Sequence, residues 1–324
     1  MRVLFKNKVV LGSVLCLTAS VSWGAMFPVA HRALQYIDPF YFAFIRYLLV
    51  TVILSGLLLF KEGKAAFRLE GKGGKLLFCG TMAFTVYNFL VFSGQHLMGE
   101  AGTITASIME VLMPLISILL LWGKTKKKPD TKTLISIGIA LTGALLVITN
   151  GSLSFFTEAS RHVFPVLLIF TGVVGWVLYS LGGSSFRGWS TLRFSTLTCL
   201  LGTAVSMVIV AAASSLQLIE VPDWNTLASI KYEMSFMVLL PGLVALVSWN
   251  AGLKALTPVN GILFISLVPV TTFVLMGFQG YRISPYELAG ATLVILALVQ
   301  NNMSQRRSLS PRYTLNLKTT KSSF

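Results

Sequence analysis

Charged side chains are scarce in this chain of 324 residues: Asp, Glu, Lys and Arg together make up 11% of it, and only 11 residues are acidic. Soluble domains carry roughly 25% charged residues. The longest polar segments, 214–235 and 302–324, are too short to bury a hydrophobic core of their own. The composition therefore excludes a soluble globular domain.

Cysteine and histidine are also rare, with three of each. The cysteines are widely separated, at Cys16, Cys79 and Cys199. This spacing argues against a disulfide framework or a metal site, and no cofactor is expected. No H-E-x-x-H or G-x-S-x-G motif occurs, so an intramembrane enzyme acting on lipids is an alternative without a catalytic cluster to support it. The G-x-x-x-x-G-K-[ST] motif is also missing, which argues against ATP-driven transport by this chain.

Apolar residues are abundant, at 55% of the chain, and the mean hydropathy is +0.78. A helix needs about 20 mostly apolar residues to cross a bilayer. Ten stretches are predicted to do so: 9–30, 39–60, 76–95, 102–122, 133–149, 163–181, 191–213, 236–255, 259–277 and 286–301. The first is longer than the apolar region of a signal peptide and has no cleavage motif after it, so we expect a retained helix.

The basic residues orient these stretches. With the N-terminus in the cytoplasm, most of the 26 Lys and Arg residues fall in loops on the inner side. By the positive-inside rule, both termini are predicted to be cytoplasmic, in a multi-pass protein of the cell (inner) membrane. The net charge of +15 then reflects orientation and attraction to the lipid bilayer, and nucleic-acid binding is not expected.

The two halves of the chain repeat several features. The same number of residues separates Arg46 from Arg193 as separates Gly143 from Gly290, and the fourth and ninth stretches each carry a central proline. Five stretches per half is an odd number, so the second half must enter the membrane in the opposite orientation. The sequence thus predicts an all-α membrane protein of ten helices in two inverted five-helix repeats, the architecture of many transporters.

Domain boundaries follow from this repeat. Residues 1–150 are predicted to form the first repeat and residues 151–301 the second, inverted one. Residues 302–324 are rich in Ser, Thr, Lys and Arg without an apolar period, which indicates a disordered basic tail on the cytoplasmic side.

With these features the chain resembles EamA-type ten-helix transporters of the drug/metabolite transporter superfamily. The residues that carry the resemblance are Trp23, Gly24, Pro39, Arg46, Pro114, Gly138, Gly143, Trp176, Tyr179, Pro269 and Gly290. It extends over about residues 9–299. The resemblance implies a carrier, often an exporter, of amino acids and other small metabolites that works by alternating access. It also implies that helices one, three, four, six, eight and nine line a central cavity and that five and ten are peripheral.

Glu110 is the one acidic residue well inside an apolar stretch. A carboxylate there costs about 2.5–3.5 kcal/mol on insertion scales, so it should face protein or water. It shares a helical face with Ser107 and Pro114. Pro114 has no N–H for the carbonyl of Glu110, and Pro269 is predicted to break the ninth helix similarly. We interpret Glu110 as a residue that accepts a coupling proton or binds a substrate ammonium; a structural carboxylate is the alternative.

Other candidate residues are polar or aromatic side chains predicted at mid-depth: Trp23, Tyr87, Asn88, Ser107, Trp176, Tyr179, Trp249 and Asn250. Such residues can line a cavity, but they can equally fasten or pack helices. Arg46 and Arg193 are expected about a third of the way in from opposite faces. Snorkelling or helix capping is the expected use of both, with a substrate carboxylate as the other option.

These features predict a secondary active transporter, not an enzyme, that moves amino acids or related amphipathic metabolites. Export and coupling to a proton are the hypotheses, and the sequence leaves the direction of transport and the coupling ion open. A lipid or lipid-linked flippase is the main alternative. The expected partners are a small-molecule substrate, the bilayer and the proton. The sequence leaves a monomer and a homodimer both open, and it does not identify the substrate.

Overall fold

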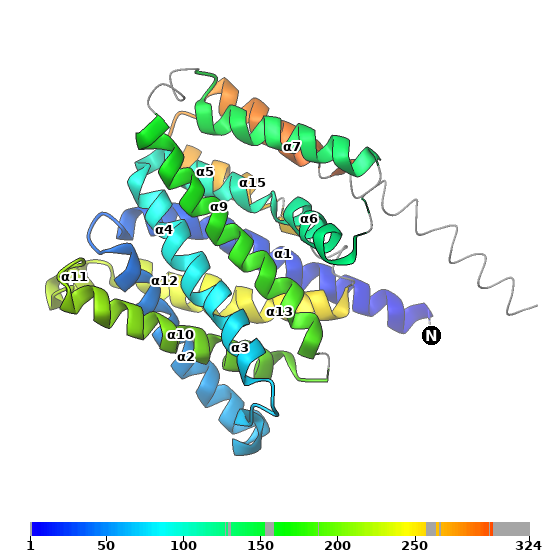
Figure 1. Ribbon diagram of the computed structural model, residues 1–324, viewed down its shortest axis with the longest axis vertical. Coiled ribbons are helices and arrows are strands. Elements are labelled where there is room, and N and C mark those ends of the chain that lie inside the picture. The colour runs from blue at the N-terminus through cyan, green and yellow to red at the C-terminus, as the bar shows by residue number, and fades with distance from the viewer. Residues whose placement is uncertain are drawn as a thin grey trace, which may run out of the picture.

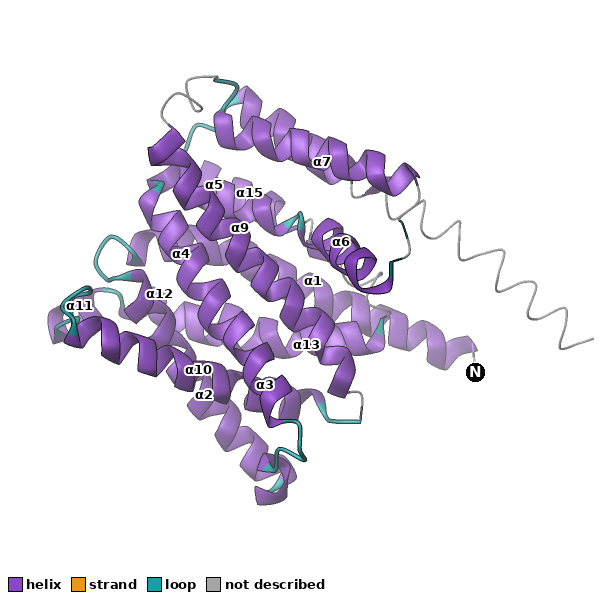
Figure 2. Ribbon diagram, in the orientation of Figure 1, coloured by secondary structure: helices purple, strands orange, loops and turns teal. Residues whose placement is uncertain are grey.

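The computed structural model describes residues 2–126, 128, 131–152, 159–186, 188–256, 264–265, 267–297 and 299–300. Within these residues all regular secondary structure is helical, as Figure 2 shows. The predicted tail, 302–324, lies outside the described residues, and so does most of the first half of the predicted ninth helix.

The first half of the chain forms helices α1 (Arg2–Ala33), α2 (Pro39–Glu62), α3 (Gly73–Gly80), α4 (Tyr87–Leu97), α5 (Gly99–Glu110), α6 (Met113–Thr125) and α7 (Thr131–Thr149). The second half forms α9 (Ala159–Gly182), α10 (Thr191–Ser215), α11 (Trp224–Ser229), α12 (Lys231–Met237), α13 (Ala245–Ala255) and α15 (Leu267–Phe278), followed by a helix over Pro285–Ala297. Figure 1 shows their arrangement.

These helices provide the predicted membrane spans. Six described spans are long and apolar enough to cross a bilayer alone, and the bent pair α5–α6 makes a seventh. Three shorter apolar helices, at Leu134–Thr149, Leu267–Phe278 and Pro285–Ala297, coincide with the remaining predicted stretches. The prediction of an all-α membrane protein with ten helices is confirmed.

Pro114 explains the bend of the fourth span. α5 ends at Glu110, α6 begins at Met113, and the two axes differ by 48°. Pro114 lies in the first turn of α6, where its missing N–H leaves the carbonyl of Glu110 without an intrahelical donor. Pro269 likewise lies in the first turn of α15. The fourth helix is therefore broken at the residue that the sequence singled out.

The third and eighth spans each contain a π-helical segment, and the two segments occupy similar positions in the two halves of the sequence. Thr81–Val86 joins α3 to α4, and Val238–Val244 joins α12 to α13. Such segments shift the register of backbone hydrogen bonds and occur frequently at functional sites. Their repetition fits the two related halves.

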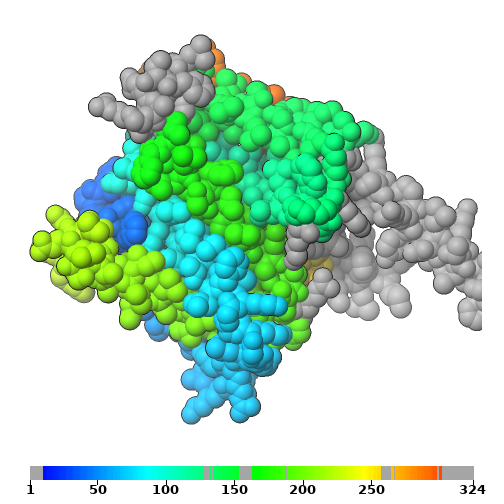
Figure 3. Space-filling model, viewed as in Figure 1, coloured from blue at the N-terminus to red at the C-terminus, as the bar shows by residue number. Residues whose placement is uncertain are grey.

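The halves interlock through close helix contacts. α4 packs along α9, and Figure 3 shows these segments, far apart in sequence, forming one continuous surface. α7 and the helix Pro285–Ala297 lie side by side along one edge of the molecule (Figure 1). A Cβ atom on Gly143 would lie 2.6 Å from the carbonyl oxygen of Gly290, and one on Gly290 would lie 2.5 Å from that of Gly143. Glycine is needed at both positions, which matches the predicted repeat.

Candidate functional site

Buried polar residues of the first half of the chain meet Trp176 of the second half around a small cavity of about 10 Å³. Side chains from α1, α2, α4, α5 and α9 line it: Trp23, Met26, Arg46, Tyr47, Tyr87, Glu110 and Trp176. This volume has room for about one water molecule. The structure therefore shows a closed centre that contains one acid and one base.

Glu110 contributes the negative charge. It is the last residue of α5 and only 2% exposed. The hydroxyl of Tyr87 donates a hydrogen bond to its Oε1 atom. The Oε2 atom is buried and has no hydrogen-bond partner among the described residues. A buried carboxylate ordinarily accepts several hydrogen bonds, so Glu110 has capacity for a further partner.

Arg46 contributes the positive charge, and it is 1% exposed. Its Nε atom donates to the carbonyl oxygen of Met237 at 3.1 Å, and its Nη1 atom lies 3.4 Å from Oδ1 of Asn88. The carbonyl of Met237 immediately precedes the π-helical segment that contains Pro241, and a carbonyl oxygen can accept from Arg46 as well as from the backbone. Asn88 is oriented in turn by its Nδ2 atom, which donates to the carbonyl oxygen of Ala83 at 2.7 Å.

Arg46 lies about a third of the way along α2, as expected, whereas Arg193 does not occupy the equivalent depth in α10. Asp38 caps α2 and Ser190 caps α10, so Arg46 lies in the third turn of its helix and Arg193 in the first. Arg46 consequently reaches the centre instead of snorkelling to an interface. The sequence reasoning left Arg46 out of the candidate site. The signal was present, because a basic residue inside an apolar stretch is as informative as Glu110.

Aromatic rings close the cavity. The ring centroids of Trp23 and Trp176 are 5.3 Å apart at 83°, and those of Trp23 and Trp249 are 5.2 Å apart at 60°. Both are edge-to-face contacts, the geometry that aromatic pairs prefer. The indole N–H of Trp23 donates to the carbonyl oxygen of Pro241 at 3.2 Å, whereas the indole nitrogens of Trp176 and Trp249 have no described partner.

Five of the predicted polar and aromatic residues do not line this cavity, and three of them, Ser107, Tyr179 and Asn250, form hydrogen bonds elsewhere. The hydroxyl of Ser107 donates to the carbonyl oxygen of Ile104 in its own helix, at 2.8 Å. Asn250 donates to the hydroxyl of Tyr179 at 3.0 Å and to that of Ser195 at 2.9 Å, which ties α13 to α9 and α10. The structure thus brings Trp23, Tyr87, Glu110 and Trp176 together and adds Asn88 and Trp249 through their contacts with Arg46 and Trp23. What these residues do in transport stays a prediction.

The EamA-like transporter family matches this chain twice, over residues 10–149 and 163–303. The chain belongs to the EamA-like transporter family. The family resemblance read from the sequence, and with it the drug/metabolite transporter superfamily, is confirmed, and the protein is a multi-pass membrane transporter.

Relatives of this EamA-like transporter are also named as transporters. The uncharacterized transporter YrdR of Bacillus subtilis is 52% identical over 302 residues, which cover 93% of this chain and 94% of YrdR. The uncharacterized transporter YyaM of the same organism is 28% identical over 291 residues, or 88% and 92% of the two chains. One crystal structure matches with a TM-score of 0.66 at 19% identity, covering 91% of this chain and 98% of that one, which shows a common fold.

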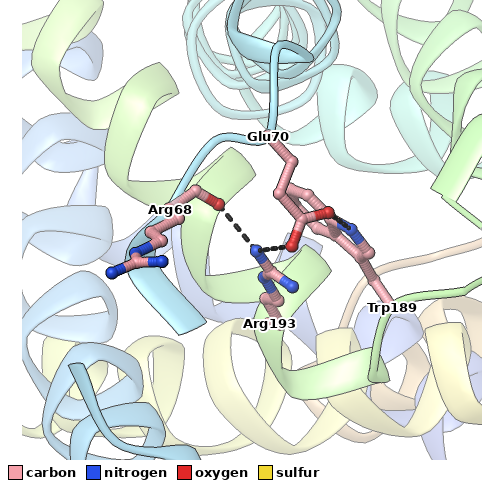
Figure 4. Close-up of polar contacts among 4 residues, drawn as sticks. All are labelled: Arg68, Glu70, Trp189 and Arg193. Atoms are coloured by element: carbon pink, nitrogen blue, oxygen red, sulfur yellow. Dashed lines mark hydrogen bonds and ion pairs between the residues drawn. The ribbon is translucent and has the colours of Figure 1, made fainter. Parts of the chain in front are cut away.

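In this EamA-like transporter a polar cluster joins the loop before α3 to the start of α10, on the side predicted to be cytoplasmic. Nη2 of Arg193 binds Oε1 of Glu70 and the carbonyl oxygen of Arg68, both at 2.7 Å (Figure 4). The indole N–H of Trp189 donates to Oε2 of Glu70 at 2.8 Å, and the Arg193 guanidinium lies 3.9 Å from the centroid of the Trp189 ring. We call these four residues the Glu70 latch.

The Glu70 latch joins the two halves of the transporter. Glu70 and Arg68 precede α3, whereas Trp189 and Arg193 lie at the start of α10. The hydrogen bonds from Arg193 and then from Trp189 lower the pKa of Glu70, whose side chain is 48% exposed. Lys254, in the last turn of α13, adds a hydrogen bond from Nζ to the carbonyl oxygen of Trp189 at 3.1 Å. An opening at this end of the molecule would have to break the latch.

Proposed function

We propose that this EamA-like transporter is a secondary active carrier of the cell (inner) membrane that exports a small amphipathic metabolite, an amino acid or a related compound, in exchange for protons. The termini would be cytoplasmic. The observation that carries the proposal is the buried Glu110 carboxylate, which has one described hydrogen-bond donor, Tyr87, and an Oε2 atom without a partner.

Charge compensation supports proton exchange at this carboxylate. An unpaired buried charge is costly in a membrane protein, so Glu110 favours either a proton or an ammonium group beside Oε2. A single carboxylate can be neutralised by one of them but gains little from both. Binding of a substrate ammonium would therefore displace the proton, which is the step that antiport requires.

Alternating access is supported by elements that can bend. Glu110 lies at the 48° break between α5 and α6, and Arg46 is anchored beside a π-helical segment. Both are places where the regular backbone ladder is interrupted, and transporters use such broken helices at midplane sites. The Glu70 latch would be the contact that closes one side.

The test compares proton movement in liposomes that contain native protein, Glu110→Gln or Glu100→Gln. Glu100 is an exposed acid in the first turn of the same helix, so its variant is a matched control. A panel of amino acids and amines is added while an entrapped dye reports pH. We expect proton movement that saturates with one compound in the native protein and in Glu100→Gln, and none in Glu110→Gln.

Substrate-coupled proton movement that persists in Glu110→Gln would refute the role of Glu110. Translocation of a fluorescent lipid by the same liposomes, without movement of any soluble compound, would replace the proposal by the flippase alternative.

A further inference from the structure

We infer that Arg46 binds the carboxylate of the transported compound, so that the central site recognises a zwitterion with an ammonium at Glu110 and a carboxylate at Arg46. The inference rests on the function proposed above and deepens it, because it assigns a substrate class. Simple amines would satisfy Glu110 alone, and the site would bind them less tightly than the corresponding amino acids.

The two buried charges at the centre are not paired with each other. Arg46 and Glu110 are 1% and 2% exposed and line the same cavity, yet they form no ion pair with each other. No other carboxylate among the described residues pairs with Arg46. Separately buried, incompletely paired charges are costly, and a ligand that carries both opposite charges would compensate them together. A zwitterion is the smallest such ligand.

The guanidinium of Arg46 is incompletely hydrogen-bonded. Its Nε atom donates to Met237 at 3.1 Å, but Nη1 has only a long contact with Asn88 Oδ1, at 3.4 Å, and a contact with the sulfur of Met26, a weak acceptor. Nη2 makes no hydrogen bond to the described residues. The backbone carbonyl therefore fixes one edge of the guanidinium, and its terminal nitrogens keep capacity for a carboxylate, which they can bind in a bidentate manner.

Aromatic rings keep Arg46 in place without a ligand. The guanidinium carbon lies 4.8 Å from the ring centroid of Tyr47 and 5.9 Å from that of Phe92, distances suited to cation–π attraction. These rings, together with Met237, hold the cation on the α2 side of the cavity. Because the cavity measures only about 10 Å³, the helices must move apart to admit an amino acid.

The test uses pairs of labelled compounds that differ only in the carboxylate: L-leucine with 3-methylbutylamine, and L-phenylalanine with 2-phenylethylamine. Binding in detergent and flux into liposomes are measured for the native protein, Arg46→Gln and Arg32→Gln. Arg32, an exposed arginine near the end of α1, provides the same substitution away from the cavity. We expect Arg46→Gln to weaken amino-acid binding about 10- to 100-fold and amine binding less than about 2-fold. Arg32→Gln should match the native protein.

Several results would overturn the inference. Equal losses for amine and amino acid in a folded Arg46→Gln protein would make Arg46 a residue that positions helices, and unchanged amino-acid binding would remove it from the site. If Arg46→Gln does not fold, the native protein is tested with the methyl esters of both amino acids, which lack the carboxylate. Esters that bind as tightly as the free amino acids contradict the inference, and esters that bind about tenfold or more weakly support it.

The same experiment separates the two proposals. Native protein that moves the amines but not the amino acids leaves the transport proposal intact and overturns the role of Arg46. Native protein that moves none of these compounds overturns the proposed substrate class and the Arg46 inference together.

Discussion

Glu110 and Arg46 are buried charges that are held by different kinds of partner. Glu110 relies on one side-chain hydroxyl, that of Tyr87. Arg46 relies chiefly on a backbone carbonyl, that of Met237, and on aromatic rings. Removing the Tyr87 hydroxyl takes away the one described hydrogen-bond donor of Glu110, whereas a single substitution around Arg46 leaves that residue with other contacts.

Tyr87→Phe removes the hydroxyl but keeps the ring, whose centroid lies 5.1 Å from that of the Trp176 ring. It leaves Glu110 without a described donor, so we expect a loss of about 1–3 kcal/mol in the free energy of unfolding. Thermal unfolding in detergent measures this loss, with Tyr36→Phe as an exposed control. In the Glu110→Gln background the loss from Tyr87→Phe should shrink. An equal loss in both backgrounds would show that the hydroxyl acts elsewhere.

At the scale of helices, prolines and helix caps decide which groups reach the centre. Pro28 in α1 has no N–H for the carbonyl of Gly24, and the hydroxyl of Thr272 donates to that oxygen at 2.8 Å. The carbonyl of Met237, which accepts from Arg46, immediately precedes the π-helical segment that contains Pro241. In both cases a side chain of one half binds a backbone carbonyl of the other half close to a proline.

The Glu70 latch is expected to weaken in acid. Because hydrogen bonds from Arg193 and Trp189 lower the pKa of Glu70 below its ordinary value of 4.5, the folded state favours the charged form. The stabilisation is therefore present above that value and is lost as the pH falls through the lowered pKa. Glu70→Gln should open the latch at neutral pH. At that pH, spin labels on Lys64→Cys and Ser184→Cys, both exposed positions, should move apart relative to native protein.

The control for the latch is Glu220→Gln, which removes an exposed carboxylate from the loop between α10 and α11. The three native cysteines are buried, so the labels report the introduced sites. Label distances in Glu70→Gln that equal those of the control at every pH would show that the latch does not hold the two halves together.

The whole molecule shows which features a sequence can reveal. Apolar length, basic loops and an odd number of spans per half were enough to predict the ten-helix inverted repeat, because a bilayer imposes those constraints on any chain. Glu110 and Pro114 could be identified from the sequence because the bilayer also makes a charge or a helix-breaking proline inside an apolar stretch conspicuous. The partners of Arg46 could not be identified, because Met237 and Asn88 lie on other helices, whose placement around α2 the apolar pattern does not record. Ser107 shares the face of Glu110, but its hydroxyl is satisfied within its own helix.

The reciprocal contact of Gly143 and Gly290 gives a test of how the ends of the two halves are joined. A Cβ on Gly143 would lie 2.6 Å from the Gly290 carbonyl oxygen and 2.9 Å from a methyl group of Val294, so α7 would have to move. Gly138, one and a half turns earlier in α7, has no atom within 4 Å of the corresponding position. Gly143→Ala should therefore lower the free energy of unfolding by about 1–3 kcal/mol. Gly138→Ala should be neutral or stabilising by up to about 1 kcal/mol, because alanine favours the helix.

Thermal unfolding in detergent compares these two variants directly, since they make the same chemical change in the same helix. The central site lies on other helices, so substrate binding by folded Gly143→Ala should stay within about 2-fold of native, whereas its unfolding midpoint falls. Equal midpoints for both variants would mean that α7 and Pro285–Ala297 are not packed at the observed distance. A fall in substrate affinity at an unchanged midpoint would instead show that this peripheral pair is coupled to the central cavity, contrary to the separation of roles that the structure indicates.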